Sequence, residues 1–374
     1  MIDPNDIDGC VQYALMIVRQ AALLARRIQA EMISPALSKT DRSPVTVADF
    51  AIQALVARRL MEAFPADPLV AEEDSSALKD SPLLEQVTAF VSSLEPAGWS
   101  VPAATRQSVC EWIDRGRTDV GEDRAGGAGA SQGLAPTAPT RYWLLDPIDG
   151  TKGFLRGGQY AVALALMMDG RAQIGVLGCP ELNLGAGCGW SSPEEPAPTG
   201  CLVYAVRGQG TWMTSLEKTH EGGSEGRSGT RPYKYPCTRL HVSRRGKPAQ
   251  ARLLRSFEAG HTNVEQIEQF AAALGIQAEP VLMDSQVKYA VLAAGQGDLI
   301  LRLLSPEKPD YREKAWDQAA GSLVVEEAGG RATDLEGKPF DFSLGRELIH
   351  NRGVLVSNGR LHQAALQALK AIGA

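Results

Sequence analysis

The stretch Asp146-Pro147-Ile148-Asp149-Gly150-Thr151 is the part of this chain on which the interpretation of the rest depends. It follows the apolar run 141–145, which predicts a strand, and it ends where a turn enters a short helix. Gly150 permits close approach of the backbone, and the N–H groups at a helix start can hold phosphate oxygens. Beside them, Asp146 and Asp149 supply oxygen ligands of the kind that Mg²⁺ prefers. Taken singly, the stretch fits a tight turn equally well, so its meaning depends on what accompanies it.

Three further acidic segments are embedded in apolar sequence. Asp49 lies in the first turn of a helix predicted for 47–63, with Thr46 as its N-cap. Glu72 follows a short predicted strand, and Asp317 begins another predicted helix. Each has a plain alternative, as a solvated strand end or a helix cap, but their order and joint occurrence favour one shared site.

These acidic residues need a counter-charge, because unpaired charges are rarely buried in apolar surroundings. No set of lysines or arginines is interleaved with them in the sequence. All the candidate ligands are oxygens, which favours Mg²⁺, with Mn²⁺ as a substitute, over Zn²⁺. A divalent ion beside a phosphate neutralises its charge and activates water. The pattern therefore predicts metal-assisted phosphoryl transfer.

Length and composition predict a two-lobed globular protein. The 374 residues exceed what one core usually serves, and 44% of them are apolar. We expect an α+β lobe over 1–190 that carries most of the metal ligands, and an α/β lobe over 191–374. The net charge of −6 argues against nucleic-acid binding.

Neither the apolar runs nor the N-terminus predicts a membrane protein. The longest apolar run, 160–168, is far shorter than the roughly 20 residues that a membrane-spanning helix needs. The acidic N-terminus lacks a leader pattern, which predicts a cytoplasmic protein, or an organellar one if a leader was removed. The six cysteines show no metal-binding spacing. Reduced thiols are the simple interpretation, and a regulatory disulfide among Cys179, Cys188 and Cys201 is the alternative.

Hydrophobic periodicity predicts the remaining elements. Hairpins are expected across Asp169-Gly170 and across 208–210. Helices are predicted near 10–32, 263–274, 286–295, 315–328 and 360–372, and later strands near 279–283, 297–303 and 353–357. Loops are predicted for the stretches rich in Gly, Pro, Ser or charge, namely 121–140, 190–200 and 217–236.

The acidic segments resemble those of the lithium-sensitive phosphatase superfamily, which includes inositol monophosphatase and fructose 1,6-bisphosphatase. Its Asp-Pro-(Ile/Leu)-Asp-(Gly/Ser)-Thr segment, Glu-Glu pair and Trp-Asp-x-Ala-Ala-Gly segment are matched by 146–151, 72–73 and 316–321. The resemblance runs over 41–342 and implies a two-lobed, layered α-β-α-β-α sandwich. Finer features are similar to the bisphosphate nucleotidase branch of yeast and plants, namely 43–49, 149–156 and 284–289.

The resemblance also implies a role for each site residue. Two or three Mg²⁺ ions would be bound by Glu72, Asp146, the main-chain carbonyl of Ile148, Asp149 and Asp317. Asp49 and Thr151 would activate the attacking water, while Gly150 and Thr151 would hold the scissile phosphate. The substrate pocket would contain His261 against the adenosine, and Ser285, Lys288 and Arg302 against a 5′-phosphate. A helix cap at His261 or Ser285, and a solvated helix face at Lys288, are the alternatives.

The expected reaction is Mg²⁺-dependent hydrolysis of the 3′-phosphate of adenosine 3′,5′-bisphosphate to AMP, by a monomer. The 5′-phosphosulfate analogue is a second expected substrate. Because the acidic motifs contain no cysteine or histidine, direct in-line attack by water is expected, without a phosphoenzyme. One rival is the same chemistry on an inositol polyphosphate or another sugar phosphate. Another is a catalytically idle sensor of nucleotide or redox state.

Overall fold

The computed structural model describes residues 2–32, 43–93, 104–118, 120, 141–184, 200–217, 237–257, 263–306 and 308–374. One sheet contains β1 (Leu69–Ala71), β2 (Arg141–Asp149), β3 (Ala161–Met168), β4 (Arg171–Cys179), β5 (Cys201–Val206), β6 (Gly210–Ser215) and β7 (Thr238–Leu240). A second sheet contains β8 (Leu253–Arg255), β9 (Val281–Leu282), β10 (Leu299–Arg302), β11 (Arg331–Thr333) and β12 (Val354–Ser357). The helices are α1 (Ile7–Met32), α2 (Ser43–Ala63), α3 (Leu83–Ser92), α4 (Arg106–Asp114), α5 (Thr151–Leu155), α6 (Val264–Leu274), α7 (Val287–Ala293), α8 (Ala319–Glu327) and α9 (His362–Ala371).

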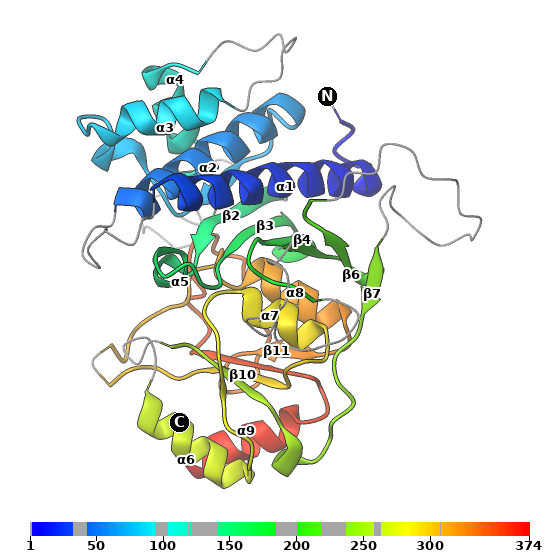
Figure 1. The fold of residues 1–374 in the computed structure, drawn as a ribbon. Coiled ribbons are helices and arrows are strands. Elements are labelled where there is room, and N and C mark those ends of the chain that lie inside the picture. Colours follow the sequence, from blue (N-terminus) through cyan, green and yellow to red (C-terminus); the bar gives the residue numbers. More distant parts are fainter. Residues whose placement is uncertain are drawn as a thin grey trace, which may run out of the picture.

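The two sheets alternate with three layers of helices (Figure 1). Helices α1 and α2 cover the outer face of the first sheet, α7 and α8 lie between the sheets, and α6 and α9 cover the outer face of the second sheet (Figure 1). The strand order is β1-β2-β3-β4-β5-β6-β7 in the first sheet and β11-β12-β10-β8-β9 in the second. This arrangement confirms the predicted α-β-α-β-α sandwich.

The hairpins form where they were predicted. At the turn between β3 and β4, Asp169 has φ 50° and Gly170 has φ 72°, as a two-residue hairpin turn requires. Strands β5 to β7 continue the first sheet from β4, so this sheet runs past residue 190. A division of the chain into lobes at residue 190 stays a prediction.

Several element boundaries differ from the predicted ones. Helix α2 begins at Ser43, so Thr46 lies inside it rather than capping it, and Asp49 lies in the second turn. Pro44 explains the early start, because proline suits the first turn of a helix. Helix α8 begins at Ala319, so Asp317 precedes it.

Strand β2 continues through Asp146 to Asp149, where the sequence predicted that the strand would end before Asp146. Pro147 has no N–H to donate to the ladder. The pairing of β2 with β3 accordingly shifts register between Asp146 and Asp149. The two aspartates of the motif are thus presented from an irregular part of a central strand.

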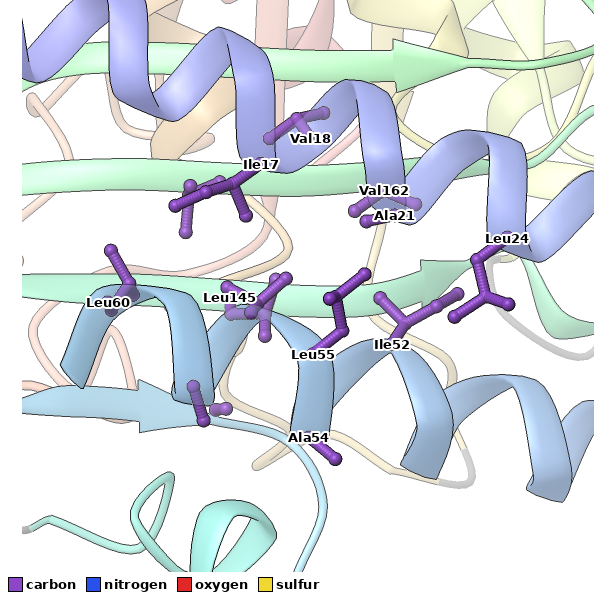
Figure 2. Packing of buried hydrophobic residues seen from close by; sticks show 14 of the residues in the cluster. Ile17, Val18, Ala21, Leu24, Ile52, Ala54, Leu55, Leu60, Leu145 and Val162 are labelled. Atoms are coloured by element: carbon purple, nitrogen blue, oxygen red, sulfur yellow. The ribbon is translucent and has the colours of Figure 1, made fainter. Parts of the chain in front are cut away.

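Aliphatic side chains hold α1 and α2 to the first sheet. Figure 2 shows Ile17 and Leu24 of α1 facing Ile52 and Leu55 of α2 over Leu145 of β2. Burying each such side chain stabilises the fold by about 1.5–3 kcal/mol. Helix α1 has the length and hydropathy of a membrane span, but 56% of that apolar window is buried inside the protein, as in a core helix. The absence of membrane contact stays a prediction.

Helix α8 packs closely on β4 because β4 carries Gly175. A Cβ atom at Gly175 would lie 2.8 Å from the main-chain oxygen of Ala320, an atom that cannot move without shifting the helix. On the other side of the same helix, a Cβ atom at Gly321 would lie 2.6 Å from the Tyr289 ring of α7. Two small residues therefore set the position of α8, and with it the position of Asp317.

We expect Gly175→Ala to lower the free energy of unfolding by about 1–3 kcal/mol, the usual cost of overpacking. Denaturant unfolding measures this. Gly158→Ala is the matched control, because its Cβ atom would meet nothing closer than 3.6 Å. Wild-type stability in Gly175→Ala would contradict the close contact between β4 and α8.

Candidate active site

The predicted acidic ligands meet at one place. Burial is the largest cause that raises the pKa of the Asp146 carboxyl well above its ordinary value. The further causes are the negative charges of other acidic residues, namely Glu72, Asp149, Asp317 and Asp49. These residues come from α2, from the end of β1, from β2 and from the segment before α8. The fold therefore clusters side chains that lie up to 268 residues apart (317 − 49 = 268).

The other carboxyls of this cluster respond in the same direction. Burial raises the pKa of Asp49 and of Asp317, with further increases from Glu73 and Asp149 respectively. Desolvation, then Glu73 and Asp149, raise the pKa of Glu72 to about 7, although the Glu72 side chain is still partly solvated and exposed. The counter-charge around these carboxylates is thus too small to make their ionised forms as stable as they are in water.

A divalent cation fits this cluster. The Oδ1 atom of Asp146 is buried and has no hydrogen-bond partner. A buried, unpartnered carboxylate oxygen among other carboxylates is what a site for a hard cation provides. Among the described residues, no group of three or more His, Cys, Asp or Glu side chains is closed tightly enough to hold a metal ion as it stands. Metal ligation by these residues stays a prediction.

Basic side chains accompany the carboxylates in space, among them Arg302, which the resemblance had assigned to the substrate pocket, and Lys314, which the sequence interpretation had not singled out. The Nη1 atom of Arg302 lies 3.0 Å from Glu313 Oε2 and 3.8 Å from Asp317 Oδ2. The charge of Lys314 lowers the pKa of Glu72. The cluster is therefore partly neutralised by the protein itself.

The 284–289 segment lies directly against the 146–151 stretch. The N–H of Gln286 donates to Asp149 Oδ2 at 2.6 Å. Gly150 has φ 96°, and a Cβ atom there would lie 2.8 Å from the Cβ of Ser285. Ser285 itself has φ 66°, a backbone conformation that costs a non-glycine residue energy and recurs at functional sites. Two motifs that were linked only by resemblance are therefore in contact.

The predicted phosphate-binding side chains line the same region. Burial lowers the pKa of Lys288, and the charges of Asp149 and Asp284 oppose that effect. The Oγ of Ser285 accepts a hydrogen bond of 3.2 Å from the N–H of Val287, the first residue of α7, whereas the N-cap position of that helix is Gln286. The O–H of Ser285 remains a donor.

Three predicted residues need separate mention. His261 lies outside the described residues, as does Cys188. Thr151 is exposed at the first position of α5, a helix that contacts α2. Within the part of the chain that the structure describes, Thr151 and Asp49 share no hydrogen bond, and their pairing stays a prediction. Ile148 is buried in the irregular part of β2, and its carbonyl as a ligand stays a prediction as well.

Cys179 and Cys201 are buried free thiols that face each other as register partners on β4 and β5. Reduced thiols stay the simple interpretation, with a regulatory disulfide as the alternative.

Gln53 is a site residue that the sequence interpretation missed. Its Nε2 donates to the carbonyls of Glu73, at 2.6 Å, and Ile113, at 2.9 Å, and its Oε1 accepts from the N–H of Glu73 at 3.0 Å. It is fully buried, one helical turn beyond Asp49 on α2. Gln53 thereby ties the strand end that carries Glu72 to the helix that carries Asp49. The available signal in the sequence was a glutamine four residues after Asp49, on the same face of the predicted helix.

Asp284 and Glu313 are two further buried acids that were missed. Asp284 forms a salt bridge with Arg156 and accepts from Ser256 Oγ at 2.7 Å, which joins the residues after α5 to those after β8. Glu313 holds Arg302 and also accepts from Gln318 Nε2 at 2.9 Å. Both support the side chains around the cluster.

A layered α-β-α-β-α sandwich with carboxylates gathered from β1, β2, α2 and the start of α8 defines a phosphatase-type architecture. The chain matches the inositol monophosphatase family over residues 9–374. It belongs to this family. The resemblance inferred from the motifs is thereby confirmed.

Its relatives define the branch more closely. The chain is 37% identical to the 3′(2′),5′-bisphosphate nucleotidase of Schizosaccharomyces pombe, over 98% of this chain and 96% of that protein. It is also 37% identical to the enzyme of the same name from Oryza sativa, over 94% and 91%. Among solved structures, an inositol monophosphatase from Zymomonas mobilis superimposes with a TM-score of 0.58 at 18% identity, over 98% of this chain and 99% of that one. SuhB of Mycobacterium tuberculosis gives 0.57 at 18% identity, with 98% of each chain covered. These structures agree with the fold.

Without divalent ions, the protein should lose stability as the pH rises. The pKa of Glu72 is about 7 in the folded chain against an ordinary 4.5, so folding favours its protonated form. That contribution is complete below pH 4.5 and is lost as the pH rises through about 7, and the buried aspartates act in the same direction. Thermal melting in a chelator from about pH 5 to about pH 8 measures the fall. Mg²⁺ should remove most of it, and a melting temperature that rises with pH in chelator would contradict the cluster.

Proposed function

We propose that this protein is a Mg²⁺-dependent phosphatase that removes the 3′-phosphate of adenosine 3′,5′-bisphosphate, giving AMP and phosphate. We propose that it also converts the 5′-phosphosulfate analogue to adenosine 5′-phosphosulfate. The observation that carries the proposal is the contact of Asp149 and Gly150 with Ser285 and Gln286, because it brings the segment that contains Lys288 beside the stretch suited to the scissile phosphate. Similarity to bisphosphate nucleotidases along nearly the whole chain supports the same substrate.

The acidic cluster would hold the metal. Two or three Mg²⁺, or Mn²⁺ in their place, would be bound by Glu72, Asp146, the Ile148 carbonyl, Asp149 and Asp317. When bound, such ions neutralise a phosphate and lower the pKa of water. The first N–H groups of a helix have no partner within it, so those of Gly150 and Thr151 can donate hydrogen bonds to the oxygens of the scissile phosphate.

Asp49 suits the role of proton acceptor. Its carboxyl is buried and its pKa is raised, so it can take a proton at a pH closer to neutral than an ordinary aspartate would. Thr151, at the start of α5, would orient the water towards Asp49. Attack in line with the leaving 3′-oxygen then needs no covalent intermediate.

The 5′-phosphate would be held by Lys288, Arg302 and the Ser285 hydroxyl. Lys288 lies among the charges of Asp149 and Asp284, and Arg302 lies 3.8 Å from Asp317, so the two cations border the acidic cluster. A fixed cation next to a buried carboxylate cluster is suited to a dianion that is bound but not cleaved. His261 would contact the adenosine. A cytoplasmic monomer is part of the same proposal.

Phosphate release from four substrates tests the assignment. Adenosine 3′,5′-bisphosphate should be hydrolysed with the highest kcat/KM, ahead of inositol 1,4-bisphosphate, fructose 1,6-bisphosphate and inositol 1-phosphate. A higher kcat/KM for an inositol or fructose phosphate would show that the assigned substrate is wrong, while the metal-assisted phosphatase reaction would still stand. No turnover of any of them with Mg²⁺ present would favour a sensor that binds without catalysis.

Asp49→Asn should lower kcat by about 10²–10⁴-fold, because it removes the proton acceptor and conserves shape. Asp146→Asn should be at least as severe, since it removes a carboxylate from the centre of the cluster. Both variants should melt no lower than the wild type in chelator, since each removes a repelling charge. Asp80→Asn, an exposed site, is the control. Normal turnover in Asp49→Asn would rule out its role.

Lys288→Ala separates a nucleotidase from a simple monophosphatase. It should raise KM for adenosine 3′,5′-bisphosphate by at least about tenfold, the loss of one charge-assisted contact worth roughly 1.5–3 kcal/mol. Hydrolysis of a monophosphate such as inositol 1-phosphate should change little. Lys370→Ala, exposed on α9, is the matched control. Equal losses on both substrates would contradict a separate 5′-phosphate site.

A further inference from the structure

We propose that Arg346 is a positioning residue that sets the separation between Glu72 and Asp317 and thereby the affinity of the site for divalent ions. The inference rests on the proposed function, because it concerns the same carboxylate cluster. Arg346 lies in neither of the segments that carry those two carboxylates, and it contacts both segments.

On one side, the guanidinium of Arg346 holds the strand end that carries Glu72. Its Nη2 donates to the carbonyl of Ala71 at 3.0 Å, and its Nη1 donates to the carbonyl of Gly116 at 3.2 Å. Ala71 is the residue before Glu72, and its own N–H donates to the same Gly116 carbonyl at 2.9 Å. Arg346, Ala71 and Gly116 are therefore joined by three hydrogen bonds at the end of β1.

On the other side, Arg346 holds the residues before Asp317. Its guanidinium carbon lies 5.0 Å from the centre of the Trp316 ring, in a cation–π contact. Its carbonyl accepts from the N–H of Ala315 at 2.9 Å. The next residues continue this pairing, since Lys314 and Glu347 form an antiparallel bridge and a salt bridge. The segment that leads into Asp317 is thus bound along its length to the segment that contains Arg346.

None of these contacts neutralises a carboxylate. The guanidinium donates to two main-chain oxygens and lies on a ring, so its bonds fix backbone positions. Charge repulsion within the cluster acts in the opposite direction, because Glu72 and Asp317 each raise the pKa of Asp146. A planar, rigid donor such as arginine suits this task, and lysine cannot make both bonds in the same plane.

Side chains that orient metal ligands without touching the ion typically contribute about 10- to 100-fold to metal affinity. Arg346→Lys should therefore raise the Kd for Mn²⁺ by about 10- to 100-fold, measured by calorimetric titration of the protein with Mn²⁺ alone, in the absence of substrate. Arg346→Met, which keeps the length of the side chain and loses the donors, should do the same. Arg207→Lys is the control, because Arg207 also donates to a main-chain oxygen, that of Ala172 at 2.7 Å, away from the cluster.

A double-mutant cycle tests whether Arg346 acts through Glu72. In a Glu72→Gln background the ligand itself is weakened, so adding Arg346→Lys should change the Kd for Mn²⁺ by less than it does in the wild type. An equal effect in both backgrounds would overturn action through Glu72.

Binding and stability separate the remaining outcomes. An unchanged Kd in Arg346→Lys, whether or not its metal-free melting temperature falls, overturns the inference and leaves the proposed function intact. A wild-type protein that binds no Mn²⁺ overturns the proposed function, and the inference with it. A raised Kd with a metal-free melting temperature close to that of the wild type supports a positioning role.

Discussion

Mutual repulsion between clustered carboxylates is the constraint around which this structure is organised. Glu72, Asp146, Asp149 and Asp317 each raise the energy of their neighbours' ionised forms, and Asp146 has an oxygen with no partner at all. Arg302 and Lys314 offset only part of this repulsion. The cluster exists because contacts elsewhere fix the backbone on which each carboxylate stands.

Those contacts are of two kinds. Apolar packing between layers places α2 and α8 against the first sheet, with Gly175 and Gly321 permitting the close approach of α8. Polar side chains then adjust individual segments. Gln53 joins the Glu72 strand end to α2, and the N–H of Gln286 fixes the carboxylate of Asp149. Packing between the layers thereby maintains a carboxylate arrangement that is locally unfavourable. Such locally unfavourable arrangements are common at binding and catalytic sites.

The sequence predicted the layers and the acidic cluster well, because both depend on local patterns. Long apolar periodicity marked α1 and the hairpins, and the Asp169-Gly170 turn has the backbone that this pair of residues favours. The short strands β7, β8 and β11 were not predicted, because each carries too little pattern, and they form because a neighbouring strand supplies hydrogen bonds. The start of α2 and the end of β2 were misplaced at Pro44 and Pro147, where proline was compatible with more than one local structure. Arg302 was recognised as a cation, whereas its partner Glu313 required the tertiary structure.

The pairing of Arg302 with Glu313 has a consequence for the end of a catalytic cycle. A guanidinium that already holds a buried carboxylate at 3.0 Å gains less from an arriving anion than a guanidinium surrounded only by water. AMP retains the 5′-phosphate that would contact Arg302, so a cation with no other partner would retain the product as firmly as it recruits the substrate. In the proposed reaction, sharing that cation with Glu313 would shorten the stay of AMP and free the site for the next substrate molecule.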